Sequence, residues 1–302
     1  IAEITDLKPG IFNLSHVDAG ELADVEILFA TWSFPHVTDE HVKKMPKLKA
    51  VFYAAGATDY FARPFLNAGV VLMSAWQMNA IPVAEFTLAQ ILLALKGFFR
   101  NTREVRETRD WARDKSYVGP GVYGETVALL GAGAIANHVA ELLKPHCAKV
   151  VVMPSRKERR TVSMEELFRT AYVVSNHLPN RDDNQKVIRR EHFESMRPGA
   201  VFINTGRGQQ VDEEAMLDVL EKRPDLTALL DVTWPEPPAT DSRMYTLPNV
   251  LVSTHIAGSV NDEVHRMADC AVAECKRYLA GEPLLYQVSE SMLITSQTPK
   301  KQ

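Results

Sequence analysis

The sequence predicts an α/β protein made of two Rossmann-like, doubly wound domains with parallel sheets. Short β-like runs alternate with helical stretches along nearly the whole chain, which is the pattern of βαβ units. A polar stretch over 101–120 interrupts this alternation, and a glycine turn between a β-like run and a helix follows it. The length of 302 residues is sufficient for two domains.

In the first part of the chain, short predicted strands alternate with short predicted helices. Strands are expected at 25–32, 48–53 and 70–74, and helices at 41–47 and 60–67. A long apolar helix is expected over 81–99, with Asn79 as a candidate cap and Pro82 in its first turn.

After the polar stretch the alternation starts again. Strands are expected at 126–130, 149–153, 172–175, 200–204, 227–230 and 250–253, and helices include 134–143, 212–222 and 260–279. We expect the two chain ends, 1–93 and 262–302, to form one domain, with a second domain, 94–261, inserted between them. The polar stretch is then a surface excursion between the domains.

Composition excludes several classes of protein. The formal net charge of -4 provides no strong field toward nucleic acid or an anionic membrane. The stretch 81–99 contains Pro82, Glu85, Gln90 and Lys96, so we expect a buried interface helix rather than a membrane span. The cysteines Cys147, Cys270 and Cys275 form no C-x-x-C pair, which argues against a metal site or disulfide framework and favours the cytoplasm.

A dinucleotide site is predicted where the β-like run 126–130 meets the next helix. Gly131, Gly133 and Ala136 fit the pattern G-x-G-x-x-G/A. The first glycine permits a tight turn, the second lets the backbone approach a pyrophosphate, and the small third residue keeps helix and strand close. The N–H groups at the helix start, Ala134 and Ile135, would face the phosphates. A glycine turn alone is often structural, but the flanking strands at Rossmann spacing favour a cofactor.

The end of the second strand of this unit bears on which dinucleotide binds. An NAD enzyme usually has Asp or Glu there for the ribose 2′-OH. This sequence has Pro154, followed by Ser155 and Arg156, with more basic residues after them. This run favours the 2′-phosphate of NADP. The alternatives are NAD and an ordinary solvated basic loop.

Three later strand ends carry polar residues: Arg207, Glu236 and His255. Ligands bind beyond the carboxyl ends of strands in open α/β sheets, and these residue types suit a carboxylate substrate. Each residue alone has an ordinary interpretation: a surface ion pair, a loop residue and a helix cap. Together they form a plausible acid, orienting partner and anion-binding group.

These segments together resemble the D-isomer-specific 2-hydroxyacid dehydrogenases. The resemblance covers nearly the whole chain and rests on Asn79–Glu85, Gly124–Gly131, His177–Pro179, Asn204–Gly208 with Val211–Asp212, Asp231 with Glu236–Pro237, and His255–Gly258. It implies hydride transfer between a nicotinamide and a small 2-keto or 2-hydroxy acid. It also implies a homodimer formed through the apolar helix.

The resemblance assigns roles residue by residue. Arg207 would bind the substrate carboxylate and polarise its carbonyl, His255 would protonate the carbonyl oxygen, and Glu236 would orient His255. The loop of Ala55, Gly56 and Ala57 would meet the substrate carboxylate. The implied cofactor-side residues are His177, Thr205, Gly206, Asp231, Ala257 and Gly258.

Two rival functions stay open at this point. The family contains a corepressor branch that uses the same fold as a dinucleotide-sensing binding protein, and turnover of keto acids would separate it from an enzyme. Formate or phosphite is a second rival substrate. The formate branch replaces the glutamate with glutamine, so Glu236 argues against formate.

Overall fold

The computed structural model describes residues 1–8, 10–14, 16, 19–111 and 116–293. The chain forms two compact units: unit 1 comprises Ile1–Ala80 with Ser259–Gln302, and unit 2 comprises Ile81–Gly258. The sequence places the domain boundaries at 93 and 261. The main difference is the stretch 81–93, in which Ala84 and Ile91 lie in the hydrophobic core of unit 2.

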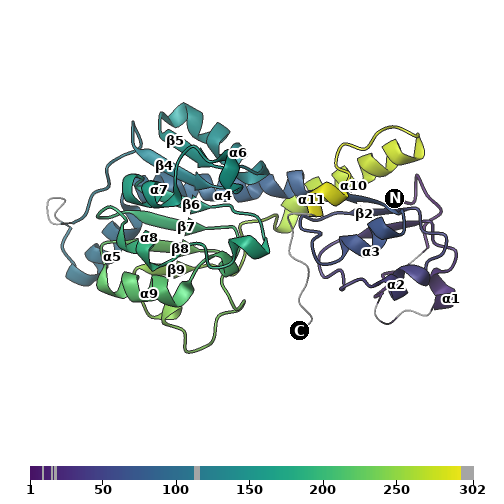
Figure 1. Cartoon of the computed structure of the whole chain (residues 1–302), viewed down its shortest axis with the longest axis horizontal. Helices are drawn as coiled ribbons and strands as arrows, with labels where there is room; N and C mark the ends of the chain where they lie inside the picture. Colours follow the sequence, from purple (N-terminus) through teal and green to yellow (C-terminus); the bar gives the residue numbers. More distant parts are fainter. Residues whose placement is uncertain (9, 15, 17–18, 112–115, 294–302) are drawn as a thin grey trace. The chain divides into compact units, whose positions relative to one another are not determined.

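Unit 2 contains a parallel six-stranded sheet in the order β5-β4-β6-β7-β8-β9 (Figure 1). The strands are β4 (Thr126–Leu130), β5 (Lys149–Met153), β6 (Val173–Asn176), β7 (Val201–Asn204), β8 (Thr227–Leu230) and β9 (Val250–Val252). β6, β7 and β8 are buried along their whole length, which explains their nearly continuous apolar sequences. The chain leaves β4 toward β5 on one side and continues through β6 on the other, so the strand order reverses beside β4.

Alternate side chains of these strands enter two separate cores. Val127 and Leu129 of β4 pack with residues of α4 and α6, whereas Ala128 and Leu130 pack with residues of α7, α8 and α9. The helices are α4 (Trp76–Leu95), α6 (Ala134–Leu143), α7 (Met164–Thr170), α8 (Arg190–Glu194) and α9 (Glu213–Lys222), with short 3-10 turns at Lys144–His146, Lys157–Arg159, Asp182–Asn184, Gly208–Gln210 and Arg243–Tyr245. Helices on both faces confirm the doubly wound fold.

The long apolar helix differs from the sequence prediction. α4 begins at Trp76, so Asn79 is inside the helix and is not its cap, and Pro82 lies beyond the first turn. The helix ends before Gly97, which has a left-handed backbone with φ 76°. A separate helix, α5 (Phe98–Thr108), follows where the sequence predicts an irregular surface stretch.

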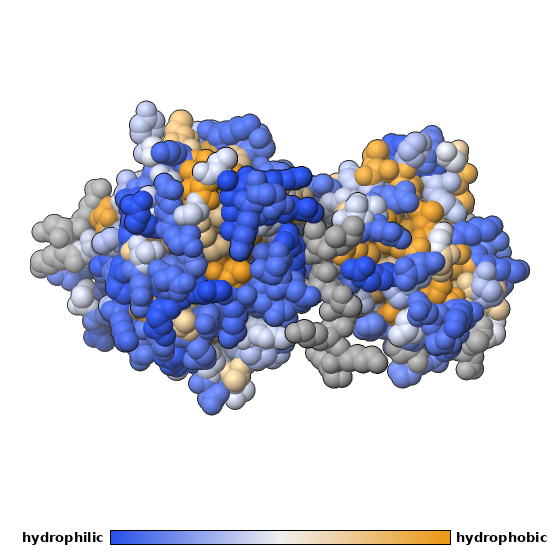
Figure 2. Space-filling view, in the orientation of Figure 1, coloured by the Kyte–Doolittle hydropathy of each residue, from blue (hydrophilic) through white to orange (hydrophobic). Residues whose placement is uncertain are grey.

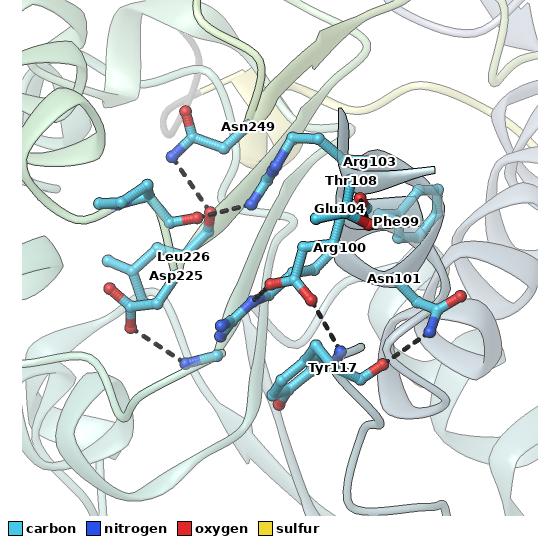
Figure 3. Close-up of polar contacts among 12 residues, drawn as sticks. Phe99, Arg100, Asn101, Arg103, Glu104, Thr108, Tyr117, Asp225, Leu226 and Asn249 are labelled. Atoms are coloured by element: carbon cyan, nitrogen blue, oxygen red, sulfur yellow. Dashed lines mark hydrogen bonds and ion pairs between the residues drawn. The ribbon is translucent and has the colours of Figure 1, made fainter. Parts of the chain in front are cut away.

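α5 is held on unit 2 by polar contacts from distant parts of the chain (Figure 3). Arg103 donates to the carbonyl oxygens of Pro224 at 2.6 Å and Pro248 at 3.4 Å. Glu104 accepts from Arg100 Nε at 2.6 Å and from the backbone N–H of Tyr117 at 2.7 Å. No side chain of α5 is fully buried, and Phe99 packs against the hydrophobic core of unit 2, so the helix is held by these bonds together with this apolar contact.

α4 is the one helix of the described residues that is long and apolar enough to cross a membrane, judged by length and composition. Of its most apolar window, 44% is buried within the protein. Ala84, Ile91, Ala94 and Leu95 pack in the core of unit 2. The buried core helix of a protein that does not cross a membrane can have the same length and composition as α4.

Unit 1 contains a parallel three-stranded sheet in the order β1-β2-β3. Its strands are β1 (Ile27–Ala30), β2 (Ala50–Tyr53) and β3 (Val71–Ser74), and its helices are α1 (Ala19–Leu22), α2 (Asp39–Lys43), α3 (Ala62–Asn67), α10 (Val264–Leu279) and α11 (Glu290–Leu293), with a 3-10 turn at Asn261–Glu263. Ala50 and Phe52 of β2 pack toward α10, whereas Val51 and Tyr53 pack toward α2 and α3. This unit is therefore also a sheet covered by helices on both faces.

The surfaces of the two units differ in polarity. On the face seen in Figure 2, hydrophilic side chains cover most of unit 2, and larger apolar patches occur on unit 1. Exposed apolar side chains of unit 1 include Ile11, Leu279 and Leu285.

Candidate active site

The turn after β4 has the shape predicted for a dinucleotide site. Gly131 has φ +112°, and a Cβ there would lie 2.4 Å from the carbonyl oxygen of His177, so no other residue fits. Gly133 is the N-cap of α6, and no side chain caps that helix. Ala136 is fully buried in the core. The N–H groups of Ala134 and Ile135 thus begin an uncapped helix, which is an anion-binding arrangement.

The turn after β5 is organised by an arginine that the sequence analysis did not single out. Arg160 donates to the carbonyl oxygen of Pro154 at 3.1 Å and to that of Ser155 at 2.8 Å. Arg156 is exposed, and no ion pair of its guanidinium occurs in the described parts of the chain. Arg160 therefore supports the turn, and Arg156 remains available to a ligand.

His177 follows β6 within a buried group of hydroxyls. Its Nε2 hydrogen-bonds with Ser175 Oγ at 2.9 Å, and its Nδ1 lies 3.4 Å from Thr205 Oγ1. Thr205 Oγ1 is also 3.3 Å from Thr87 Oγ1 of α4. Burial lowers the pKa of His177 to about 4, so the imidazole is neutral at neutral pH. His177 thereby joins the ends of β6 and β7 to α4.

Asp231 connects the end of β8 to the loop after β9. Its Oδ1 accepts from Ser253 Oγ at 2.6 Å and from the N–H of Ile256 at 2.9 Å. Its Oδ2 accepts from the N–H of Ala257 at 3.0 Å. Because a carboxylate has about four acceptor positions, one position remains for a ligand. Gly258 follows this loop and is partly buried.

The candidate acid and its partner are in contact. His255 Nδ1 is 2.6 Å from Glu236 Oε1, although the two residues lie on the loops after β9 and β8. Their side chains are 47% and 41% exposed. A carboxylate at Nδ1 orients the ring and leaves Nε2 free to exchange a proton with a ligand.

A partly buried acid interacts with the loop that carries Glu236. Glu213, at the start of α9, accepts from the backbone N–H of Trp234 at 2.8 Å. The pKa of Glu213 is raised to about 8, chiefly by burial, with smaller contributions from the charges of Glu214 and Glu236. Glu213 thus anchors the loop that carries Glu236. Its position directly after Asp212, in the Val211–Asp212 motif, is a signal that sequence reasoning did not use.

Arg207 follows β7 and is half-buried. Its Nη1 donates to the carbonyl oxygen of Gly206 at 2.7 Å, which leaves its other N–H donors for a ligand. The backbone N–H groups of Gly206 and Arg207 donate to the buried side-chain amides of Asn204 and Gln210.

The predicted substrate loop lies in unit 1, directly after β2. Ser74 Oγ is within hydrogen-bond distance of the carbonyl oxygens of Ala55, at 2.9 Å, and Gly56, at 2.6 Å. A Cβ on Gly56 would lie 3.3 Å from Asn79 Nδ2, and Asn79 Oδ1 accepts from the N–H of Ser259 at 3.0 Å. Ser74 and Asn79 therefore support this loop, whereas the sequence interpretation gave Asn79 a capping role. Ala57 is exposed at the end of the loop.

The reversal of strand order beside β4, the glycine turn and the uncapped helix together define a dinucleotide-binding domain of the Rossmann class. The chain belongs to the D-isomer-specific 2-hydroxyacid dehydrogenase family. The model of that family's NAD-binding domain matches residues 88–257. The family and fold predicted from the sequence are thus confirmed, and the matched domain is one that binds a nicotinamide dinucleotide.

Individual relatives agree with this assignment. Glyoxylate/hydroxypyruvate reductase B of Klebsiella pneumoniae is 30% identical over 287 residues, which cover 90% of this chain and 86% of that protein. D-3-phosphoglycerate dehydrogenase of Methanocaldococcus jannaschii is 28% identical over 273 residues, which cover 87% of this chain and 51% of that protein. The chain thus spans about half the length of the phosphoglycerate dehydrogenase.

Solved structures of similar fold agree with this family assignment. The TT0316 protein from Thermus thermophilus has a TM-score of 0.74 and 26% identity, covering 90% of this chain and 88% of that chain. TP0037 from Treponema pallidum, a D-lactate dehydrogenase, has a TM-score of 0.71 and 26% identity, with the same coverage of both chains.

Proposed function

We propose that this protein reduces a small 2-keto acid to the D-2-hydroxy acid, and catalyses the reverse oxidation, with a nicotinamide dinucleotide. The observation that carries this proposal is the contact between His255 and Glu236 at 2.6 Å, on the loops beyond the carboxyl ends of β9 and β8. Reduction of a ketone requires one proton and one hydride. When bound, the nicotinamide supplies the hydride.

In this proposal His255 supplies the proton. The carboxylate of Glu236 holds the ring through Nδ1, so that Nε2 donates to the carbonyl oxygen as negative charge develops there. In the reverse direction Nε2 accepts the hydroxyl proton. General acid catalysis of this kind contributes roughly 10²–10⁴-fold to rate.

Arg207 binds the carboxylate of the keto acid and polarises its carbonyl. A planar guanidinium offers paired N–H donors that match a carboxylate. The loop of Ala55, Gly56 and Ala57 is the part of unit 1 proposed to offer backbone N–H groups to a substrate carboxylate, and Ser74 fixes the loop by bonding to its carbonyl oxygens. The proposed substrate domain corresponds to unit 1 and the proposed cofactor domain to unit 2, in place of the boundaries at 93 and 261 expected from the sequence.

The dinucleotide is held by residues at the carboxyl ends of the unit 2 strands. The N–H groups of Ala134 and Ile135 and the turn at Gly131 and Gly133 face the pyrophosphate, and the backbone of Gly133, where an added Cβ would meet open space, leaves room for it. The groups around the nicotinamide and its ribose are assigned to His177, Thr205, Gly206, Asp231, Ala257 and Gly258.

We further infer a preference for NADP over NAD. Pro154 replaces the acid that would bond a free 2′-OH, and the exposed Arg156 has no protein partner among the described ion pairs. Ser155 and Arg156 would contact the 2′-phosphate, while Arg160 holds the turn through two carbonyl oxygens.

The proposed assembly is a homodimer formed through the α4–α5 region. Exposed apolar side chains occur in these helices and in the stretch that follows α5: Leu93, Phe98, Trp111, Val118 and Tyr123, with Trp111 and Tyr123 each 89% exposed. The contacts of Figure 3 hold the segment in place, and a partner copy would remove these side chains from water. Sedimentation equilibrium tests this: Trp111→Glu should shift a wild-type dimer to monomer, and a monomeric wild type would contradict it.

The cytoplasm is the proposed location, since the described cysteines Cys147, Cys270 and Cys275 are all free thiols.

One experiment tests the reaction directly. The purified chain is mixed with NADPH or NADH and with glyoxylate, hydroxypyruvate, pyruvate and longer 2-keto acids in turn, and the nicotinamide absorbance is followed. We expect oxidation of the cofactor with at least one acid and a D-hydroxy acid as the product on a chiral column. Dinucleotide binding without turnover of any keto acid would contradict an enzyme and favour a binding protein.

A further inference from the structure

Three amide side chains form a buried cluster behind Arg207. Asn176 is the last residue of β6, Asn204 is the last residue of β7, and Gln210 closes the 3-10 turn that follows Arg207. Asn176 is completely buried, and Asn204 and Gln210 are each 1% exposed. The proposed reaction gives none of the three a role.

The amides bond to one another across two strand ends. Asn176 Nδ2 donates to Gln210 Oε1 at 2.6 Å and to Asn204 Oδ1 at 2.9 Å. Gln210 Nε2 donates to the carbonyl oxygens of Leu178 at 2.7 Å and Pro179 at 2.9 Å. The cluster therefore joins the turn after β6 to the turn after β7.

The same amides bond to the backbone on both sides of Arg207. The N–H of Gly206 donates to Asn204 Oδ1 at 3.1 Å, and the N–H of Arg207 donates to Gln210 Oε1 at 3.3 Å. Asn204 Nδ2 donates to the carbonyl oxygen of Arg207 at 3.2 Å. The backbone N–H and the carbonyl oxygen of Arg207 are thus both hydrogen-bonded to side-chain amides of this cluster.

Gly206 permits this close approach. A Cβ there would lie 3.0 Å from Asn176 Nδ2 and 3.0 Å from Gln210 Oε1. The glycine and the amides are therefore matched in shape. Apolar side chains of the same size would fill the space, but they would not direct the N–H of Arg207.

We propose that Asn176 and Gln210 are positioning residues that orient the Gly206–Arg207 turn, so that the guanidinium meets the carboxylate of the 2-keto acid. This rests on the proposed function for the substrate role, and on the bonds above for the shape of the turn. A misplacement of about 1 Å costs as much as 10²-fold in rate, so a turn held by buried amides has kinetic consequences.

The test separates positioning from stability by exchanging the amides for apolar side chains of similar size. The variants are Asn176→Leu, Gln210→Met and the double variant. Each single change leaves a buried polar partner unsatisfied, whereas the double change removes both members of the Asn176–Gln210 bond. We expect the melting temperature of the double variant to be higher than the sum of the two single losses predicts.

A matched control comes from the amino ends of the strands of the same sheet, opposite the amide cluster. Asn249, which is labelled in Figure 3, directly precedes β9. Its side chain is 1% exposed. Its Nδ2 donates to the carbonyl oxygens of Leu220 at 2.9 Å, Leu226 at 3.1 Å and Arg223 at 3.3 Å. Asn249→Leu therefore removes a buried amide with comparable bonds, far along the strands from the proposed site.

We expect kcat/KM for the keto acid to fall by about tenfold or more in the double variant, with the nucleotide Kd changed much less. Asn249→Leu should lower the melting temperature and leave kcat/KM at the wild-type value. A double variant with wild-type kcat/KM would reduce the amide pair to a structural role and overturn the proposal.

Backbone amide exchange provides a readout without turnover. Exchange of the Arg207 N–H should accelerate by about tenfold or more in the double variant and stay unchanged in Asn249→Leu. If the wild type reduces no keto acid, the proposed function fails, and exchange at Arg207 alone decides whether the amides hold the turn. Unchanged exchange in the double variant would overturn the positioning role in either case.

Discussion

The amino ends of the unit 2 strands form one edge of the sheet, the amino edge, and their carboxyl ends form the other, the carboxyl edge. At the amino edge, polar side chains pair with other groups of the same chain. At the carboxyl edge, several polar side chains keep hydrogen-bond donors that are free for a ligand. Glu125 directly precedes β4 and accepts from Arg197 Nη1 at 2.6 Å. Tyr172 precedes β6, and its hydroxyl bonds to that of Tyr117. The amino edge is thus internally satisfied.

The backbone explains part of this difference. Loops at the amino edge present carbonyl oxygens, and donors of the chain reach them: Arg103 bonds Pro224 and Pro248, and Asn249 bonds Leu226 (Figure 3). At the carboxyl edge a helix begins after β4, so N–H groups collect there and α6 carries no capping side chain. His255, Glu236 and Arg207 all belong to that edge. Similar residue types therefore stabilise one edge and are available for binding at the other.

The largest expected effect at the carboxyl edge is that of His255→Ala. Without the proton donor, kcat for keto-acid reduction should fall by about 10²-fold or more, while nucleotide binding stays near the wild-type value. Steady-state kinetics and fluorescence titration of the nucleotide measure the two quantities. A variant with nearly wild-type kcat would remove His255 from the mechanism.

Arg207→Lys should damage substrate use and spare the cofactor. Replacing a two-pronged donor by a point charge loses a charge-assisted bond of about 1.5–3 kcal/mol, which is roughly tenfold or more in kcat/KM. The comparison is between KM for the keto acid and Kd for the nucleotide. A change confined to the nucleotide constant would make Arg207 a cofactor residue.

Burial of His177 should make stability depend on pH. Its pKa is lowered to about 4 in the folded state from the ordinary value of 6.5, so the unfolded chain takes up the proton first as the pH falls. Stability from this residue is present above the unfolded pKa and is lost between the two values, by about 2 kcal/mol near pH 5. Chemical unfolding of wild type and His177→Gln at about pH 8 and pH 5 measures it. Equal pH dependence in both proteins would refute the assignment.

Arg156→Ala should reduce the preference for NADPH. One Arg–phosphate contact contributes about 1.5–3 kcal/mol, or roughly tenfold in kcat/KM, unless solvent screens it. The ratio of kcat/KM for NADPH and NADH should therefore decrease in the variant, and also with added salt in the wild type. A wild type that prefers NADH at low salt would show that this loop serves a free 2′-OH.

Arg197→Met tests the amino edge and should have the smallest effect. Removing the partner of Glu125 should cost about 1 kcal/mol of unfolding free energy, because the arginine is partly exposed and its apolar stem is retained. No change in kcat/KM is expected. A clear loss of activity at equal stability would mean that the two edges are coupled.

The sequence by itself determined the features that depend on local rules. Apolar runs placed β4, β5 and β8 at the observed residues, and the turn at Gly131 was recognisable because it requires a positive φ and a close backbone approach. The motifs of Arg207, Glu236 and His255 were recognisable by their family spacing.

Only the tertiary structure decided the features that depend on distant partners. α5 was predicted as irregular because its anchors, Pro224 and Pro248, lie more than a hundred residues further along the chain. The amide cluster was missed for the same reason: Asn176 at the end of β6 and Gln210 in the turn after β7 lie 34 residues apart in sequence, and nothing local distinguishes a buried amide from a solvated one. Hydrogen bonds between side chains depend on which strands become neighbours, and that is decided when the sheet assembles.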